Sequence, residues 1–95
     1  MTEKIRVHAV ISGKVQGVCF RLETQRAAEK YGVSGWVRNR RDGTVEALFE
    51  GDEDQVSSVL EWCKKGPPLS QVRNVEMSRE TYSGEFEEFK ITYTV

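Results

Sequence analysis

Residues 33–50 read VSGWVRNRRDGTVEALFE and hold two β-rich runs, Val33–Asn39 and Thr44–Glu50. Between the runs lies the segment Arg41-Asp42-Gly43, whose Asp-Gly pair supplies the positive φ that hairpin turns require. The two runs are therefore predicted to pair as antiparallel strands. Strand-like and helical patterns flank this hairpin on both sides, so the hairpin fixes the order of elements from which the fold is predicted.

The residues before the hairpin predict a strand, a loop and a helix. Apolar residues alternate with more polar ones, the pattern of a strand buried mainly on one face, at Ile5, Val7, Ala9 and Ile11. Two glycines, Gly13 and Gly17, then interrupt the alternation. From Phe20 to Tyr31, small and apolar residues recur at helical spacing up to Gly32, which is predicted to end the helix.

The residues after the hairpin predict a second helix and two further strands. Asp52 followed by Gln55 resembles a capping box at a helix start. One helical stripe follows, which the segment Gly66-Pro67-Pro68 halts, and it consists of Val56, Val59, Leu60 and Cys63. The remaining strand candidates are Val72–Glu80 and Phe86–Val95.

This order of elements predicts the fold class. The order is β-α-β-β-α-β with an additional strand at the C-terminal end. We therefore expect an α+β protein with a ferredoxin-like split βαβ arrangement, in which two helices lie on one face of a mostly antiparallel sheet. At 95 residues and 10.9 kDa, the chain is expected to form a single domain over residues 1–95.

Composition and charge argue against several classes of protein. With 14 Lys and Arg residues against 15 Asp and Glu residues, the formal net charge is -1, so no global positive field attracts nucleic acid or an anionic membrane. No apolar run approaches the roughly 18 residues of a membrane span, and Met1–Arg6 is too polar for a secretory signal, which predicts a cytoplasmic protein. Cys19 and Cys63 fit no metal-binding spacing, so no metal is expected.

The segment Gly13–Arg21 carries the candidate binding site. It places two glycines at a strand-to-helix junction and ends in an arginine at the helix entrance. Main-chain N–H groups at a helix start have no helical partner, and with the helix dipole they attract a tetrahedral anion. Arg21 would add a planar fork of charge-assisted hydrogen bonds. This pattern indicates a local phosphate site.

The residues alone leave other interpretations of this loop open. A Gly-x-x-x-Gly spacing also occurs in ordinary strand-helix turns. No Gly-Lys-Ser/Thr and no Gly-x-Gly-x-x-Gly is present, which argues against nucleotide binding. A cysteine-dependent phosphatase needs an arginine several residues beyond its cysteine, whereas Arg21 lies only two positions after Cys19.

Two motifs resemble the signatures of a known family. Residues 13–21, GKVQGVCFR, resemble the pattern G-x-V-Q-G-V-x-F-R of the acylphosphatase family, and residues 35–39, GWVRN, resemble its second signature, G-W-V-x-N. The family fold is also ferredoxin-like. The resemblance implies hydrolysis of the carboxyl-phosphate bond of small acylphosphates to a carboxylate and inorganic phosphate. It implies a positioned water, no metal or other cofactor, and no covalent intermediate.

The resemblance also implies a role for each matching residue. The Arg21 side chain holds the phosphoryl group together with the main chain of Val15, Gln16, Gly17, Val18, Cys19 and Phe20. The Asn39 side chain positions the attacking water. An amide can orient water as donor and acceptor, but it cannot act as a base near neutral pH. His8, the only histidine, is expected on the helix-free face of the sheet and away from the loop.

Two alternatives to an enzyme stay open. One is a non-catalytic domain that binds phosphoryl groups or carbamoyl phosphate, because acylphosphatase-like modules also occur inside larger maturation enzymes. The other is a ferredoxin-like module that binds a small ligand or RNA without turnover, although no basic-glycine-aromatic RNA motif is present. The expected partner is a small acylphosphate, with no nucleic acid and no membrane, and the expected state is a monomer.

Overall fold

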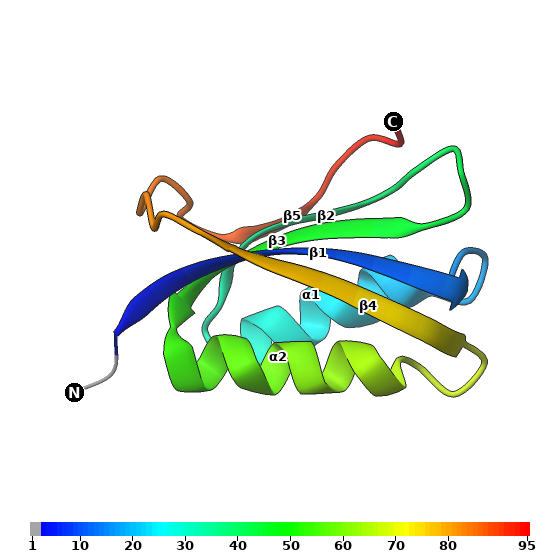
Figure 1. Cartoon of the computed structure of the whole chain (residues 1–95), viewed down its shortest axis with the longest axis horizontal. Helices are drawn as coiled ribbons and strands as arrows, with labels where there is room; N and C mark the ends of the chain where they lie inside the picture. The colour runs from blue at the N-terminus through cyan, green and yellow to red at the C-terminus, as the bar shows by residue number, and fades with distance from the viewer. Residues whose placement is uncertain (1–2) are drawn as a thin grey trace.

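Two helices lie on one face of a five-stranded sheet in the computed structural model, which describes residues 3–95 (Figure 1). The elements in chain order are β1 (Lys4–Lys14), α1 (Phe20–Lys30), β2 (Ser34–Asn39), β3 (Val45–Asp52), α2 (Glu53–Lys65), β4 (Gln71–Glu80) and β5 (Phe89–Ile91). The predicted order of strands and helices is therefore confirmed.

The strands lie in the order β4-β1-β3-β2-β5. β3 is central, β1 lies between β3 and β4 and pairs antiparallel with both, and β2 pairs antiparallel with β3 through the predicted hairpin. β5 pairs with β2 in parallel, so the sheet is mixed, with four mostly antiparallel strands and one parallel edge strand. The predicted ferredoxin-like α+β fold is confirmed, and the additional strand extends the β2 edge.

The hydrophobic core fills the space between the sheet and the two helices. The alternating residues of β1 are buried as predicted, and Ala9 and Ile11 are fully buried. Thr24 and Ala28 of α1 and Val59 of α2 face the same core. The rings of Phe49 and Phe89 stack with centroids 5.5 Å apart, which anchors the short strand β5 to the interior.

Two predictions about the element ends are corrected. The last strand was expected over Phe86–Val95, but β5 spans only Phe89–Ile91; beyond it the chain still follows β2 through a hydrogen bond from the Thr92 N–H to the Val37 carbonyl oxygen. Asp52 is the N-cap of α2, but its side chain makes no capping bond, so the capping box is wrong. The Asp52 carboxylate pairs with Lys4 Nζ at 2.8 Å instead, because β1 and β3 place the two residues opposite each other.

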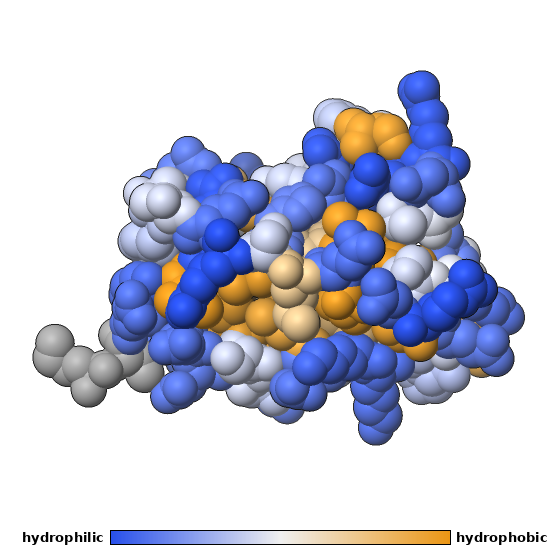
Figure 2. All heavy atoms as spheres, in the orientation of Figure 1, coloured by the Kyte–Doolittle hydropathy of each residue, from blue (hydrophilic) through white to orange (hydrophobic). Residues whose placement is uncertain are grey.

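Figure 2 shows hydrophobic side chains along the line where β4 meets α2, framed by hydrophilic residues. Leu60, Val72 and Val75 are only partly buried and pack against the core from these two elements. This edge of the core is therefore covered less completely than its centre. Within residues 3–95, neither helix is long and apolar enough to cross a lipid bilayer.

Candidate active site

One end of the sheet brings together the loop between β1 and α1 and the tip of the β2–β3 hairpin (Figure 1). A pocket of about 450 Å³ opens there. Its lining residues are Val15, Gly17, Cys19, Phe20, Arg21, Leu22, Asn39 and Ile91. Arg21 and Asn39, 18 positions apart in the sequence, thus share one pocket with the loop main chain. Gln16 and Val18, also expected at this site, do not line it.

The loop owes its shape to two residues with left-handed backbone conformations. Gly17 has a φ of 74°, and a Cβ built there would meet nothing within 4 Å, so backbone conformation rather than space favours glycine at this position. Cys19 has a φ of 62° and is the only non-glycine residue between positions 3 and 95 with a positive φ. Such a conformation costs of order 1–3 kcal/mol and tends to occur at functional sites. Turns of this kind make concave nests of N–H groups.

The main-chain N–H groups of this loop are not used by the fold. Among the described residues, none of the N–H groups from Gln16 to Arg21 donates a hydrogen bond, although the carbonyl oxygens of Cys19 and Phe20 accept bonds from Glu23 and Thr24 in α1. N–H groups at a helix start carry the positive end of the helix dipole. The loop therefore offers several uncommitted donors to an anion in the pocket.

The Arg21 guanidinium is uncommitted as well. It makes no hydrogen bond and no ion pair with any of residues 3–95, and it lines the pocket. Other arginines are held by carboxylates: Arg26 pairs with Glu23 at 2.8 Å, and Arg38 pairs with Glu46 at 2.8 Å. Arg21 is thus a cation beside the loop N–H groups, and no carboxylate lines the same pocket within the described chain.

Asn39 presents a buried oxygen that lacks a partner. It ends β2, opposite Val45 of β3, and its carbonyl oxygen accepts a hydrogen bond from the Val95 N–H at 3.2 Å. Its side-chain Oδ1 is buried and accepts no hydrogen bond from residues 3–95. An unsatisfied buried acceptor costs about 1–3 kcal/mol, and such atoms usually bind ordered water. Asn39 lines the pocket, so its side-chain amide belongs to the same site as the loop and Arg21.

The Gln16 side chain joins the two halves of the site. Its Nε2 donates hydrogen bonds to the carbonyl oxygens of Arg40 at 2.7 Å and Thr44 at 2.9 Å. Arg40 directly follows Asn39, so these two hydrogen bonds, called the Gln16 brace below, fix the loop relative to the strand end that carries Asn39. Only a main-chain role was expected for Gln16. In the sequence, this contact is indicated only by the presence of a polar amide side chain, Gln16, in a loop that also contains Val15 and Val18.

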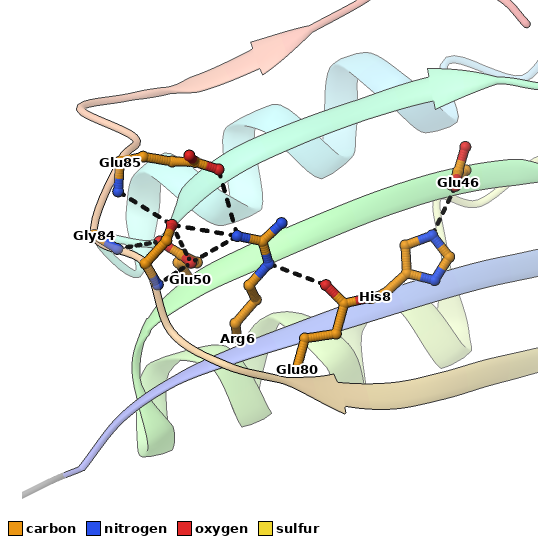
Figure 3. A network of polar contacts seen from close by, with 8 residues as sticks. Arg6, His8, Glu46, Glu50, Glu80, Gly84 and Glu85 are labelled. Atoms are coloured by element: carbon orange, nitrogen blue, oxygen red, sulfur yellow. Dashed lines mark hydrogen bonds and ion pairs between the residues drawn. The ribbon is translucent and has the colours of Figure 1, made fainter.

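His8 lies elsewhere, as expected. It projects from the sheet face opposite its buried neighbours on β1, and its Nε2 lies 2.7 Å from Glu46 Oε2 (Figure 3). Burial raises the pKa of Glu46, but hydrogen bonds from His8 and Arg38 outweigh it, so the Glu46 pKa lies below its ordinary value. The histidine is therefore engaged in an ion cluster rather than in the pocket.

A second polar network holds the far end of the sheet. The Glu50 carboxylate is only 1% exposed and accepts hydrogen bonds from the N–H groups of Ser83 and Gly84 at 2.9 and 3.1 Å (Figure 3). Arg6 lies 3.4 Å from the same carboxylate and also pairs with Glu80. This network ties the chain after β4 to the sheet. Among residues 3–95, no group of three or more His, Cys, Asp or Glu side chains could hold a metal ion.

Comparisons with known proteins agree on one family. The sequence model of the acylphosphatase family matches residues 7–91 of this chain. A protein named acylphosphatase from Pelotomaculum thermopropionicum is 52% identical over 90 residues, which cover 95% of this chain and 98% of that protein. The crystal structure of acylphosphatase from Bacillus subtilis superimposes with a TM-score of 0.90 at 37% identity, covering 94% of this chain and 99% of that one. Full-length HypF, crystallised in a phosphate- and nucleotide-bound form, gives a TM-score of 0.88 at 26% identity over 99% of this chain and 12% of its own.

Proposed function

The chain belongs to the acylphosphatase family, and from that membership we propose how its pocket hydrolyses the carboxyl-phosphate bond of small acylphosphates. The observation that carries the proposal is the pairing of two unused groups in one pocket. The Arg21 guanidinium and the buried Asn39 Oδ1 both lack partners within residues 3–95, and the residues Arg21 and Asn39 both line the cavity beside the loop N–H groups. A buried acceptor without a partner, such as Asn39 Oδ1, costs free energy, and the partly exposed Arg21 guanidinium is free to bind an anion.

The phosphoryl group binds to the main chain of Val15–Phe20 and to Arg21. Several N–H groups and a bidentate guanidinium can each contact a different phosphoryl oxygen. In the transition state of phosphoryl transfer, negative charge spreads over these oxygens, and fixed donors stabilise it without rearranging. Arg21 is therefore assigned to binding and to charge stabilisation. Gly17 lets the main chain approach the phosphate closely.

Asn39 orients the attacking water. Its side-chain amide, which lines the pocket, holds the water by a hydrogen bond and places the water oxygen for attack on phosphorus opposite the leaving carboxylate oxygen. The new P–O bond forms as the bond between phosphorus and the acyl oxygen breaks, and the electron pair of that bond leaves with the carboxylate. The proton released by the water passes to a phosphate oxygen or to bulk water, because Asn39 cannot accept it.

Few catalytic groups suffice for this reaction. A carboxylate is a good leaving group, so no strong general acid is required. Orientation of the water and stabilisation of the phosphoryl charge remain as the two tasks, and one amide and one guanidinium with the loop N–H groups perform them. The substrate is thus a small acylphosphate, and the products are a carboxylate and inorganic phosphate.

A direct assay tests this function. The purified chain is incubated with benzoyl phosphate, with and without EDTA, and the loss of acylphosphate is followed over time. Hydrolysis of many equivalents per protein molecule at the same rate in both samples is the expected result. Binding of inorganic phosphate without any turnover would reject the enzyme and leave a phosphoryl-binding domain.

The structural match to HypF favours that second candidate, because there the same fold forms only 12% of a longer chain. In such a setting a domain can pass its ligand to another site rather than release product. The relative from Pelotomaculum thermopropionicum supports the enzyme instead, since this chain covers 98% of its length. The turnover assay separates the two candidates.

We also propose that residues 1–95 form one domain that acts as a cytoplasmic monomer without nucleic acid. The net charge of -1 offers no general attraction to a polyanion, and both Cys19 and Cys63 are free thiols, as is usual in a reducing compartment. Sedimentation equilibrium with and without RNA measures the oligomeric state. A mass of about twice 10.9 kDa would reject the monomer.

A further inference from the structure

Two exposed aliphatic side chains line the pocket beside the proposed catalytic groups. Leu22 is 41% exposed and Ile91 is 38% exposed, and both line the same cavity as Arg21 and Asn39. Scattered exposed apolar residues are normal on a protein surface, but two that share a pocket with unsatisfied polar groups favour a ligand with one apolar end and one polar end. Burial of Leu22 and Ile91 by a ligand would be favourable.

The structure holds these two side chains in place relative to each other. Gln25, one helical turn after Leu22, donates from Nε2 to the Phe89 carbonyl oxygen at 3.1 Å, and so links α1 to β5. Phe89 is buried, and Ile91 lies two positions beyond it on β5. A wall formed from a helix and a strand that are bonded to each other needs little reorganisation to receive a ligand.

Charge in the pocket limits the chemistry of the apolar end. Among the described residues that line the pocket, Arg21 alone carries a charge, and the proposed function uses it for the phosphoryl group. A charged acyl chain would find no second counterion there, and it would lose hydration beside Leu22 and Ile91. An uncharged apolar acyl group has no charge to desolvate, and its contact with the two aliphatic side chains is favourable.

We propose that Leu22 and Ile91 form the acyl-binding wall and select acylphosphates with an uncharged, apolar acyl group larger than acetyl. The inference rests on the proposed function, because the phosphoryl group must lie between the loop and Arg21 for the acyl group to reach the wall. Leu22 and Ile91 are thus specificity-determining residues, and they take no part in bond breaking. Aromatic acyl groups such as benzoyl fit this class.

The test compares benzoyl phosphate with acetyl phosphate on the wild type and on the variants Leu22→Gln, Ile91→Thr and their combination. Glutamine retains helix propensity and threonine retains strand propensity, so both substitutions remove apolar surface with little effect on local structure. The control is Leu69→Gln, because Leu69 is 75% exposed and does not line the pocket.

In the double variant, kcat/KM for benzoyl phosphate is expected to fall roughly fivefold to tenfold, mainly through KM, as the apolar contact area is lost. The value for acetyl phosphate and the dissociation constant of inorganic phosphate should stay within about twofold, and Leu69→Gln should match the wild type. An unchanged ratio of the two kcat/KM values would overturn the acyl wall. Each single variant decides the question if the double variant does not fold, since each should lower the ratio by itself.

Failure of the proposed function gives a different result. In that case the wild type hydrolyses neither substrate, whereas failure of the acyl wall leaves both hydrolysed with unaltered selectivity in every variant. Competition by benzoate and by acetate adds a readout that does not depend on turnover. Benzoate should inhibit the wild type more strongly than acetate does, and the double variant should lose that difference.

Discussion

Gln16 Nε2 donates a hydrogen bond to the Arg40 carbonyl oxygen at 2.7 Å, and this bond ties the loop that precedes α1 to the end of β2. The loop carries the N–H groups proposed to bind the phosphoryl group, and β2 ends at Asn39, proposed to hold the water. A phosphorus atom and its attacking oxygen must be aligned to within a fraction of an ångström for efficient transfer. The brace therefore couples binding of the phosphate to placement of the water.

Replacement of Gln16 by Leu tests this coupling. The variant removes both donors and leaves the carbonyl oxygens of Arg40 and Thr44 without that partner, so the free energy of unfolding should fall by about 1–3 kcal/mol. The value of kcat should fall roughly tenfold, more than phosphate affinity falls, because alignment is lost while the donors remain. Urea denaturation and steady-state kinetics measure the two effects. Gln55→Ala, at an exposed position on α2, serves as the control and should alter neither.

Replacement of Arg21 by Ala should weaken both substrate binding and turnover. A fixed donor to the charge of a transition state is worth about 100- to 1,000-fold in rate, and the same guanidinium contacts phosphate in the ground state. The dissociation constant of inorganic phosphate should therefore rise along with the loss of kcat/KM. Arg26→Ala is the matched control, because Arg26 lies on the same helix but pairs with Glu23. Equal kinetics of the two variants would remove Arg21 from the site.

Asn39→Ala separates function from stability. Turnover should fall about 100-fold because the water is no longer oriented, whereas phosphate affinity should stay within about twofold of the wild type. The free energy of unfolding should not decrease and can increase by about 1 kcal/mol, since the variant removes a buried oxygen that lacks a partner. Asn74→Ala, at an exposed position on β4, controls for the loss of an amide. A variant that is less stable and fully active would contradict the assignment.

Glu46 makes the stability of the protein depend on pH in the acid range. Its pKa is lowered in the folded state, so its contribution is present above the unfolded value near 4.5 and is lost as the pH falls through the folded pKa. Glu46→Gln should therefore lower the free energy of unfolding by about 1–2 kcal/mol at pH 7, with a difference that shrinks below pH 4.5. Urea denaturation from pH 3 to pH 7, about the range of carboxyl titration, measures it. Glu76→Gln, at an exposed position on β4, is the matched control for the loss of a carboxylate, and a constant difference across that range for Glu46→Gln would rule out the ion cluster as its source.

Much of the fold could be predicted because local patterns and tertiary structure agree. The apolar alternation in β1 and the apolar stripe of α2 match the residues that are buried in the core, and the Asp-Gly turn matches the antiparallel pairing of β2 with β3. The length of β5 could not be predicted in this way. Its bounds depend on the pairing with β2 and on the stack of Phe89 against Phe49, which no local pattern encodes. The capping box failed for a similar reason, because Lys4 from another strand takes the Asp52 carboxylate.

For the candidate site too, part of the arrangement could be predicted from the sequence and part could not. Arg21 and Asn39 could be selected by motif, but the lack of a partner for each is a property of the assembled chain. The Gln16 brace spans 24 positions to Arg40, and Leu22 lies far from Ile91 in the sequence, so neither relationship follows from spacing. Physical contacts between distant segments carried the information that sequence patterns lacked.

Titration of the isotopically labelled protein with inorganic phosphate, followed by amide chemical shifts in NMR spectra, tests the central assignment most directly. Because the N–H groups from Gln16 to Arg21 make no other hydrogen bond within residues 3–95, their resonances should shift most and saturate together. The side-chain resonances of Arg21 and of the Asn39 amide should follow the same curve. Saturable shifts elsewhere, with the resonances from Gln16 to Arg21 unmoved, would contradict the phosphoryl site.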